Sequence, residues 1–325
     1  MEGNRSALIT GITGQDGSYL AEMLLGKGYE VYGLIETRRE ECLAHLEGCL
    51  DDIHQVYGNL ATTRGIHRVI REIAPDEVYN LGAITMVTLA WKDPVKVFQI
   101  NGMGVLRLLD GIRRHSPKTR LFQASTSELF GDVTESPQNE DTPFRPRNPY
   151  GSSKLMAHQA VVQFREQQDL HASCGIMYNH ESPRRGPLFV TRKITQSAAR
   201  ISLGHDETLF LGNLDARRDW GYAPEYVEAM WRMLQQDRAD DYVIATGQAH
   251  SVRDMVAAAF ARVGVSDWEA HTRVDPRFYR PAEEVDMLGD ASKAERVLGW
   301  KPRVPFEEMV GLMVDADLAR LRAEG

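Results

Sequence analysis

The segment 148–154, NPYGSSK, places a tyrosine and a lysine at a spacing that suits proton transfer. Pro149 is favoured in the first turn of a helix, and Tyr150 and Lys154 would then lie one turn apart on the same face. A free tyrosine has a pKa near ~10, which is too high for a base at neutral pH. A nearby ammonium favours the phenolate, and lowering the pKa by about three units corresponds to roughly 4 kcal/mol. The pattern predicts an acid–base pair, with an amphipathic surface helix as the alternative.

Hydroxyl and carboxyl side chains follow the apolar segment 121–124. Thr126 and Glu128 come after this expected buried strand, and ligands of open α/β sheets bind at the carboxyl ends of strands. Thr126 could hydrogen-bond a substrate hydroxyl that Tyr150 deprotonates, and Glu128 could remove a carbon-bound proton beside a ketone. Helix capping is the alternative role for these hydroxyls, with Ser127 as the best cap candidate.

A glycine-rich turn, GITGQDG, follows the first apolar segment and precedes a helical pattern. Glycines at this spacing permit a tight turn and a close approach of backbone amides to a pyrophosphate at a helix N-terminus. The pattern predicts a dinucleotide site, with a surface turn as the alternative, and a bound nicotinamide cation would add to the effect of Lys154 on Tyr150. The expected contacts in this turn are Gly11, Thr13, Gly14, Gln15, Asp16 and Gly17.

The end of the second apolar segment bears on which dinucleotide binds. Glu36 could accept hydrogen bonds from a free ribose hydroxyl, which favours NAD. Arg38 and Arg39 could instead bind a 2′-phosphate, which favours NADP. A solvated loop is the third interpretation, and this segment by itself leaves the choice open.

The elements that must position these residues alternate between short apolar segments and helical patterns, which is typical of a parallel sheet covered by helices. Expected strands lie at 7–10, 31–35, 77–81, 121–124, 208–211 and 242–245. A first helix should end at Gly26, a later one should begin after Ser251 as N-cap, and the last should begin near Pro305. We therefore expect an α/β protein with a Rossmann-type doubly wound parallel sheet at 1–175 and a smaller C-terminal α/β substrate-binding lobe at 176–325. The chain should cross between these two units more than once.

Composition excludes several classes of protein. The chain has 325 residues, 42% hydrophobic and 26% charged, and a net charge of −8, which argues against a nucleic-acid partner. Its apolar runs are far shorter than the ~18–20 residues of a membrane span, so no membrane partner is expected.

Three cysteines favour a reducing, cytoplasmic setting. Cys42, His45 and Cys49 lack a fourth ligand at zinc-site spacing, so no metal is expected. Four tryptophans, Trp91, Trp220, Trp231 and Trp300, are expected to anchor packing.

Over nearly its whole length the chain resembles the GDP-mannose 4,6-dehydratases, which are extended short-chain dehydrogenase/reductases. The segments that carry this resemblance are LITGITGQDGSYLAEMLL, QASTSELFG, NPYGSSK, NHESPRRG, FVTRKI, LGNLDARRDWG and WKPR. The resemblance implies conversion of GDP-mannose to GDP-4-dehydro-6-deoxymannose by internal hydride transfer and elimination of water. It also implies a homodimer or homotetramer. A reductase or epimerase of a GDP-linked 4-keto sugar, or a 4,6-dehydratase of another NDP-hexose, is the alternative.

The resemblance also implies roles for individual residues. Thr126, Glu128, Tyr150 and Lys154 match the catalytic positions. Beyond the glycine turn, the cofactor contacts would be Glu36, Arg38, Arg39, Asn59, Leu60, Leu81, Ala83, Tyr150, Lys154, His180 and Arg185. The nucleotide-sugar contacts would be Thr85, Asn179, Lys193, Gly212, Arg218, Arg280 and Glu283. NADP is the expected cofactor, with NAD possible because of Glu36.

Some positions depart from the family pattern. The second strand commonly ends in paired arginines followed by serine, whereas here Glu36 precedes Arg38 and Arg39. Asn59 stands where an aspartate often contacts adenine, and Ile84 replaces a glutamine. Arg184, Arg192 and Arg217 are further basic residues that could contact phosphate. About half of the basic residues named for such contacts should instead be ordinary salt-bridged arginines. Glu283 and Glu284 remain alternatives for the contact to the guanosine ribose.

Overall fold

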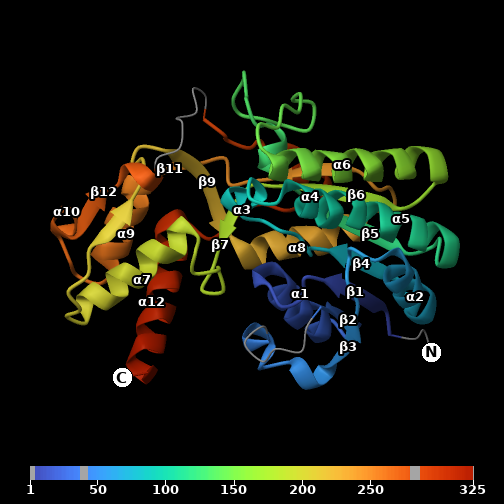
Figure 1. Ribbon diagram of the computed structural model, residues 1–325, viewed down its shortest axis with the longest axis horizontal. Helices are drawn as coiled ribbons and strands as arrows, with labels where there is room; N and C mark the ends of the chain where they lie inside the picture. The colour runs from blue at the N-terminus through green and yellow to red at the C-terminus, as the bar shows by residue number, and fades with distance from the viewer. Residues whose placement is uncertain (1–3, 37–42, 279–285, 325) are drawn as a thin grey trace.

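The larger part of the protein is built around a seven-stranded sheet (Figure 1). The computed structural model describes residues 4–36, 43–278 and 286–324. The strands follow the order β10-β6-β5-β4-β1-β2-β3, and every neighbouring pair is parallel. Their bounds are β1 Ser6–Thr10, β2 Glu30–Ile35, β3 Ile53–Tyr57, β4 Glu77–Asn80, β5 Arg120–Thr126, β6 Ala172–Met177 and β10 Asp241–Ile244. Successive strands are added outward on both sides of β1, which confirms the doubly wound Rossmann arrangement.

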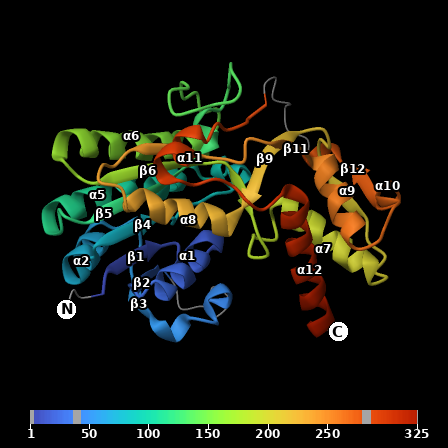
Figure 2. The same cartoon turned by 180° about the vertical axis from the view of Figure 1, so that it is seen from behind.

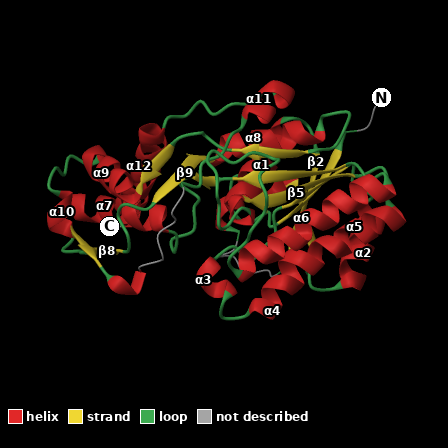
Figure 3. Cartoon of the chain, turned by 90° about the horizontal axis from the view of Figure 1, so that it is seen from above, coloured by secondary structure: helices red, strands yellow, loops and turns green. Residues whose placement is uncertain are grey.

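Helices cover both faces of this sheet (Figure 3). One face carries α1 (Gln15–Gly26), α8 (Ala223–Leu234) and α11 (Ser292–Leu298), and its core includes Leu20 and Met230. The other face carries α2 (Thr63–Ile73), α5 (Met103–His115) and α6 (Pro149–Gln168), and its core includes Leu108 and Val161. Short helices α3 (Val87–Ala90) and α4 (Pro94–Val97) precede α5. The single-turn elements are η2 Ala44–Leu46, η3 Leu50–Asp52, η4 Phe98–Gly102, η5 Ser127–Leu129 and η6 Pro276–Phe278.

A smaller unit packs beside the carboxyl edge of the large sheet (Figures 1 and 2). It contains a three-stranded sheet, in the order β11-β9-β7, and a two-stranded sheet of β12 and β8. The elements of this unit are β7 Asn179–Glu181, α7 Val190–Ser202, β8 Leu209–Leu211, β9 Arg217–Tyr222, β11 Ala249–Ser251, α9 Val252–Arg262, α10 Trp268–His271, β12 Thr272–Val274 and α12 Phe306–Glu324. Its core joins α7, α9 and α12 through Ile194, Phe260 and Val310.

The chain passes between the two units repeatedly. After β7 to β9 it returns to the large sheet as α8 and β10, and after α10 and β12 it returns again as α11. Figure 2 shows α8 and α11 lying along the larger unit while α12 ends in the smaller one. Because β7 follows β6 directly, a residue near position 180 lies between the two units.

Local sequence signals account for most element boundaries. The expected strands correspond to β1, β2, β4, β5, β8 and β10 within one or two residues at each end. Ser251 is confirmed as the N-cap of α9, because its side chain accepts from the Asp254 amide and Asp254 accepts from the Ser251 amide. Helix capping, the alternative role for the hydroxyls after this strand, is performed by the Thr126 side chain and not by Ser127. Trp91 is 65% exposed, which contradicts its expected packing role, whereas Trp220 and Trp300 are buried.

Across the described residues, no helix combines the length and apolarity that a membrane crossing requires.

Candidate active site

The turn between β1 and α1 brings backbone atoms unusually close together. Gly11 has φ of +70°, and a Cβ there would lie 2.8 Å from the Gly82 nitrogen. A Cβ at Gly17 would collide with the Gly11 carbonyl oxygen, so both positions require glycine. Gly14 is the N-cap of α1 and supplies no side-chain cap, and its amide donates to the Gly11 carbonyl at 3.0 Å. The first-turn amides of α1 therefore suit an anion, and the turn fits the pyrophosphate of a dinucleotide.

Asp16 in this turn forms a partly buried ion pair with His180 from β7. The Asp16 Oδ2 lies 2.9 Å from His180 Nε2, and His180 Nδ1 lies 2.7 Å from the Tyr178 carbonyl oxygen. Burial opposes ionisation of Asp16, but the charge and hydrogen bond of His180 hold the pKa of that carboxyl below its usual value. Burial likewise opposes protonation of His180, and Asp16 raises its pKa overall. This pair joins the cofactor turn to the smaller unit.

The four expected catalytic residues come from the end of β5 and the start of α6. Tyr150, Lys154 and Thr126 are buried, and the Thr126 side chain lies close enough to the Tyr150 phenol to influence its ionisation. The Lys154 Nζ donates to the Ala124 carbonyl at 2.8 Å and lies 6.0 Å from the centre of the Tyr150 ring. One hydroxyl, one phenol and one ammonium thus meet at the carboxyl edge of the large sheet.

The expected lowering of the Tyr150 pKa includes the effect of a nicotinamide cation, and the residues of the protein by themselves act in the opposite direction. Burial raises the pKa of Tyr150 to about 12, and the Thr126 side chain opposes this only in part. Burial also lowers the pKa of Lys154 to about 8, against the attraction of Asp16. The sequence spacing suggests an effect of the Lys154 ammonium on the Tyr150 pKa, but it says nothing of how far both groups are removed from water.

Asn148 is a site residue that the sequence analysis did not single out. Its Nδ2 donates to Glu128 Oε2 at 2.8 Å, and its Oδ1 accepts from the Gly151 amide at 2.8 Å. Asn148 therefore caps α6, which carries Tyr150, and orients the Glu128 carboxylate with the same side chain. An asparagine directly before Pro149 is a recognisable N-cap signal. Its contact with Glu128, twenty residues earlier, depends on the fold.

The adenosine end of the expected cofactor site lies at the ends of β2, β3 and β4. Asn59 Nδ2 donates to Glu36 Oε1 at 2.6 Å, and Asn59 Oδ1 accepts from the Ala61 amide at 2.7 Å. The Leu60 side chain packs against Gly82, which lies between Leu81 and Ala83 in the chain. Arg38 and Arg39 lie outside the described residues.

The basic residues expected near phosphate have different surroundings. Arg192 is buried against Asp317, and its Nη1 donates to the Pro183 carbonyl at 2.6 Å, so it is a structural ion pair. Arg184 pairs with Glu22 at 2.5 Å, and Arg217 lies 3.2 Å from Asp286. Arg185 lies 3.1 Å from Glu181, and its guanidinium stacks 3.7 Å from the centre of the Phe189 ring.

The expected nucleotide-sugar contacts are spread over the smaller unit. Asn179 on β7 pairs with Trp220 on β9, which places Arg218 two residues away on the same strand. Lys193 Nζ donates to the Phe210 carbonyl at 2.5 Å, and Gly212 follows in the same segment. Burial lowers the pKa of Lys193.

Thr85 is exposed at the end of the β4 segment, while the adjacent Ile84 packs near Tyr150. Arg280, Glu283 and Glu284 lie outside the described residues.

Comparison with known proteins adds a family match. Residues 8–313 match the family model described as GDP-mannose 4,6 dehydratase. The GDP-mannose 4,6 dehydratase of Cricetulus griseus is 49% identical over 345 residues, covering 97% of this chain and 92% of that protein. Among solved structures, RMD from Pseudomonas aeruginosa complexed with NADPH has a TM-score of 0.81 at 23% identity, covering 98% and 100% of the two chains. The dTDP-glucose 4,6-dehydratase from Bacillus anthracis in complex with NAD has a TM-score of 0.84 at 20% identity, covering 96% of each chain. These two structures share the fold of this chain.

Proposed function

The chain belongs to the GDP-mannose 4,6-dehydratase family, and from this membership we propose that it converts GDP-α-D-mannose to GDP-4-dehydro-6-deoxy-D-mannose. The observation that carries this proposal is the cluster of Thr126, Tyr150 and Glu128, in which Asn148 orients the carboxylate. An alcohol oxidation needs a base for a hydroxyl proton, and an elimination needs a second base for a carbon-bound proton. The cluster offers one group for each step.

The residues of the chain have separate tasks in this reaction. Tyr150 withdraws the proton of the 4-hydroxyl, which Thr126 positions by hydrogen bonding. Glu128 takes the proton from C5, which the new ketone has acidified, and delivers a proton to the 6-hydroxyl, which departs as water. A proton then returns to C5. A nicotinamide dinucleotide held at the glycine turn supplies a hydride acceptor and donor, so that the reaction has no net redox change.

Lys154 and Asn148 support the two bases. The Lys154 ammonium, held by the Ala124 carbonyl, stabilises the Tyr150 phenolate that accepts the 4-hydroxyl proton. Asn148 keeps the Glu128 carboxylate directed at the site while its amide oxygen caps α6, whose first turn contains Tyr150. One side chain therefore sets the relative position of both bases.

NADP is the cofactor that we propose, bound by Gly11, Thr13, Gly14, Gln15, Asp16, Gly17, Asn59, Leu60, Leu81, Ala83, His180 and Arg185. The similar fold occurs with NADPH in one solved structure and with NAD in another. Glu36 supports the NAD alternative, because its carboxylate stands at the end of β2 and accepts from Asn59. Titration of the protein with NADP and NAD, followed by tryptophan fluorescence, should give the tighter dissociation constant for NADP. A tighter constant for NAD would assign Glu36 to the ribose.

The nucleotide-sugar is proposed to bind along the smaller unit through Thr85, Asn179, Lys193, Gly212, Arg218, Arg280 and Glu283. In this assignment residues 1–175 mainly form the cofactor unit and 176–325 mainly the nucleotide-sugar unit. The protein is further proposed to be cytoplasmic and to act as a homodimer or homotetramer. Light scattering after size-exclusion chromatography distinguishes these two assemblies from each other and from a monomer.

The test of the activity is to incubate the purified protein with GDP-mannose and NADP and to analyse the product by mass spectrometry. We expect loss of one water from the sugar without a net change in nicotinamide absorbance. Net consumption of NAD(P)H with a GDP-linked 4-keto sugar would indicate a reductase. Turnover of another NDP-hexose with none of GDP-mannose would contradict the proposed substrate.

A further inference from the structure

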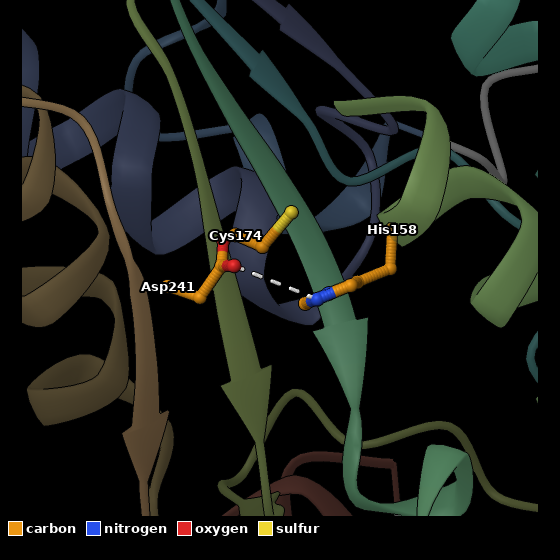
Figure 4. Close-up of side chains that lie close together, drawn as sticks. All are labelled: His158, Cys174 and Asp241. Carbon is orange, nitrogen blue, oxygen red and sulfur yellow. Dashed lines mark ion pairs between the residues drawn. The ribbon is translucent and has the colours of Figure 1, made fainter. Parts of the chain in front are cut away.

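A buried group of polar side chains lies next to the catalytic residues but takes no part in the steps above. His158 on α6, Cys174 on β6 and Asp241 on β10 have ligand-type atoms that all lie within 4.8 Å of one another. Figure 4 shows the three side chains converging, with the 3.6 Å approach of His158 Nε2 to Asp241 Oδ2 dashed. His158 is 4% exposed and Cys174 is fully buried.

The contacts of this group favour a hydrogen-bond network over a metal site. Asp241 accepts two hydrogen bonds from the Arg165 guanidinium, each at 2.9 Å, so both of its oxygens are engaged. His158 Nδ1 lies 3.0 Å from the Ser125 hydroxyl oxygen. A cation in this group would have to displace a bidentate arginine, which is a strong and geometrically specific partner of a carboxylate.

The surroundings of His158 define its proton position. Its Nε2 lies 3.6 Å from Asp241 Oδ2 and its Nδ1 lies 3.0 Å from the Ser125 hydroxyl oxygen, an arrangement that favours hydrogen on Nε2 and leaves Nδ1 to accept from Ser125. Burial lowers the pKa of His158, and the nearby Arg165 adds to this while Asp241 opposes it. The edge of the Phe144 ring packs on the imidazole, with 5.0 Å between the ring centres. The ring is therefore neutral and has a fixed orientation.

Ser125 and His158, the two partners of this hydrogen bond, each lie close to expected catalytic residues. Ser125 stands between Ala124, whose carbonyl accepts from Lys154, and Thr126, whose hydroxyl oxygen accepts from the Glu128 amide at 3.3 Å. His158 stands four residues after Lys154 on α6, which is one further turn along the same face. The Ser125–His158 hydrogen bond therefore ties the end of β5 to α6 one turn beyond the catalytic lysine.

We propose that His158 is a positioning residue: anchored by the Asp241–Arg165 pair, its imidazole accepts from Ser125 and thereby holds Ala124 and Thr126 on β5 in register with Lys154 and Tyr150 on α6. The proposal rests on the proposed function, because its main readout is turnover. Catalysis depends on sub-ångström placement of such groups, and a misplacement of about 1 Å from a remote change can lower a rate about a hundredfold. The link restrains the part of the site in which proton transfer from the 4-hydroxyl occurs.

Two substitutions of His158 separate positioning from simple filling of space. His158→Asn places an amide oxygen near the position of Nδ1, so it can still accept from Ser125, whereas His158→Leu fills the space without an acceptor. We expect His158→Leu to lower kcat about tenfold, with KM for GDP-mannose changed less than about threefold, and His158→Asn to retain most of kcat. Ser125→Ala should match His158→Leu, and the double variant should lose no more than either single variant, because both changes break the same bond.

His171→Leu is the matched control. Burial lowers the pKa of His171, as it does for His158. His171 directly precedes β6, at the end of that strand away from the catalytic residues, and its Nε2 lies 2.9 Å from the Gln236 carbonyl oxygen. This variant should lose thermal stability with kcat unchanged. Nitrogen NMR of the wild-type histidines supplies a readout independent of turnover, and it should find His158 neutral with its hydrogen on Nε2.

Three outcomes would overturn the positioning role. They are an unchanged kcat in His158→Leu, an equal loss in His158→Asn and His158→Leu, and an NMR signature of hydrogen on Nδ1. If His158→Leu does not fold, Ser125→Ala and the NMR measurement still decide. Absence of wild-type activity toward every nucleotide-sugar would contradict the proposed function instead, and the tautomer would then still test the hydrogen-bond network.

Discussion

The β5–α6 region and the α7–β9 region hold their expected site residues in different ways. Thr126, Tyr150 and Lys154 are buried, and each is tied to backbone or side-chain partners on neighbouring elements. Lys193 and Arg218 are only partly buried, and their side chains donate to the Phe210 and Arg217 carbonyl oxygens. The β5–α6 region has the fixed geometry that proton transfer needs, while the α7–β9 region offers charge that can adapt to phosphate. Changes in the first region should therefore affect kcat, and changes in the second should affect KM.

The largest effect is expected from Tyr150→Phe. Removal of the phenolic hydroxyl leaves the 4-hydroxyl without its base, so kcat should fall by about 10²–10⁴-fold while GDP still binds. Steady-state kinetics and calorimetry with GDP measure the two effects. Tyr79→Phe is the matched control, because it removes a buried hydroxyl that donates to Glu77 at 2.6 Å near the amino end of β4. A fully active Tyr150→Phe would refute the proposed chemistry.

A smaller loss is expected from Glu128→Gln, which replaces the second base with an amide. Elimination should slow by about a hundredfold, and more than the first oxidation does. Exchange of the C5 proton with deuterated water, followed by mass spectrometry, reports on this step alone. Asn148→Ala leaves the carboxylate but removes its donor, so its effect on exchange should lie between wild type and Glu128→Gln. Normal C5 exchange in Glu128→Gln would assign the step to another group.

The α7–β9 region should respond through KM. Lys193→Met removes one ammonium, and a hydrogen bond to a charged group contributes about 1.5–3 kcal/mol, so KM for GDP-mannose should rise about tenfold or more. The value of kcat should stay within about twofold if the reacting groups are unmoved. Arg200→Met on the same helix is the control, since Arg200 is exposed and pairs with Glu207 at 3.6 Å. A drop in kcat with unchanged KM would erase the distinction between the two regions.

The smallest effect is a pH dependence of stability in the β5–α6 region. The pKa of Lys154 is about 8 in the folded protein, below its ordinary value of 10.5. Between these values the unfolded chain binds more protons, so this group makes stability rise with pH, by at most about 1.4 kcal/mol per unit. Urea unfolding at several pH values from 8 to 10 should show a steeper rise for the wild type than for Lys154→Met. Parallel curves would mean that Lys154 is not desolvated.

Local features of the sequence predicted much of the fold and part of the site. The glycines of GITGQDG predicted a tight turn after the first strand, and in the structure a Cβ at Gly11 or Gly17 would strike backbone atoms. The spacing of Tyr150 and Lys154 identified a shared helix face, because a helix repeats every ~3.6 residues. The strand ending at Thr126 was recognised from its apolar run. Each of these inferences depends on residues that lie close together in the chain.

Other features depend on which distant segments the fold brings together. Asn148 reaches Glu128 across twenty residues, and His180 reaches Asp16 across 164. The same is true of the Asp241 carboxylate beside His158, which comes from the edge strand β10. No periodicity in the sequence encodes these neighbours, since strand order decides them.

The sequence by itself determined the type of fold, the glycine turn and the Tyr150–Lys154 spacing, because sterics and helix geometry act over a few residues. Only the tertiary structure decided how acidic those groups are. Burial raises the pKa of Tyr150 to about 12 and lowers that of Lys154 to about 8, against the direction that their spacing alone suggested for the tyrosine. Desolvation depends on everything packed around a group, so it exists only once the chain has folded.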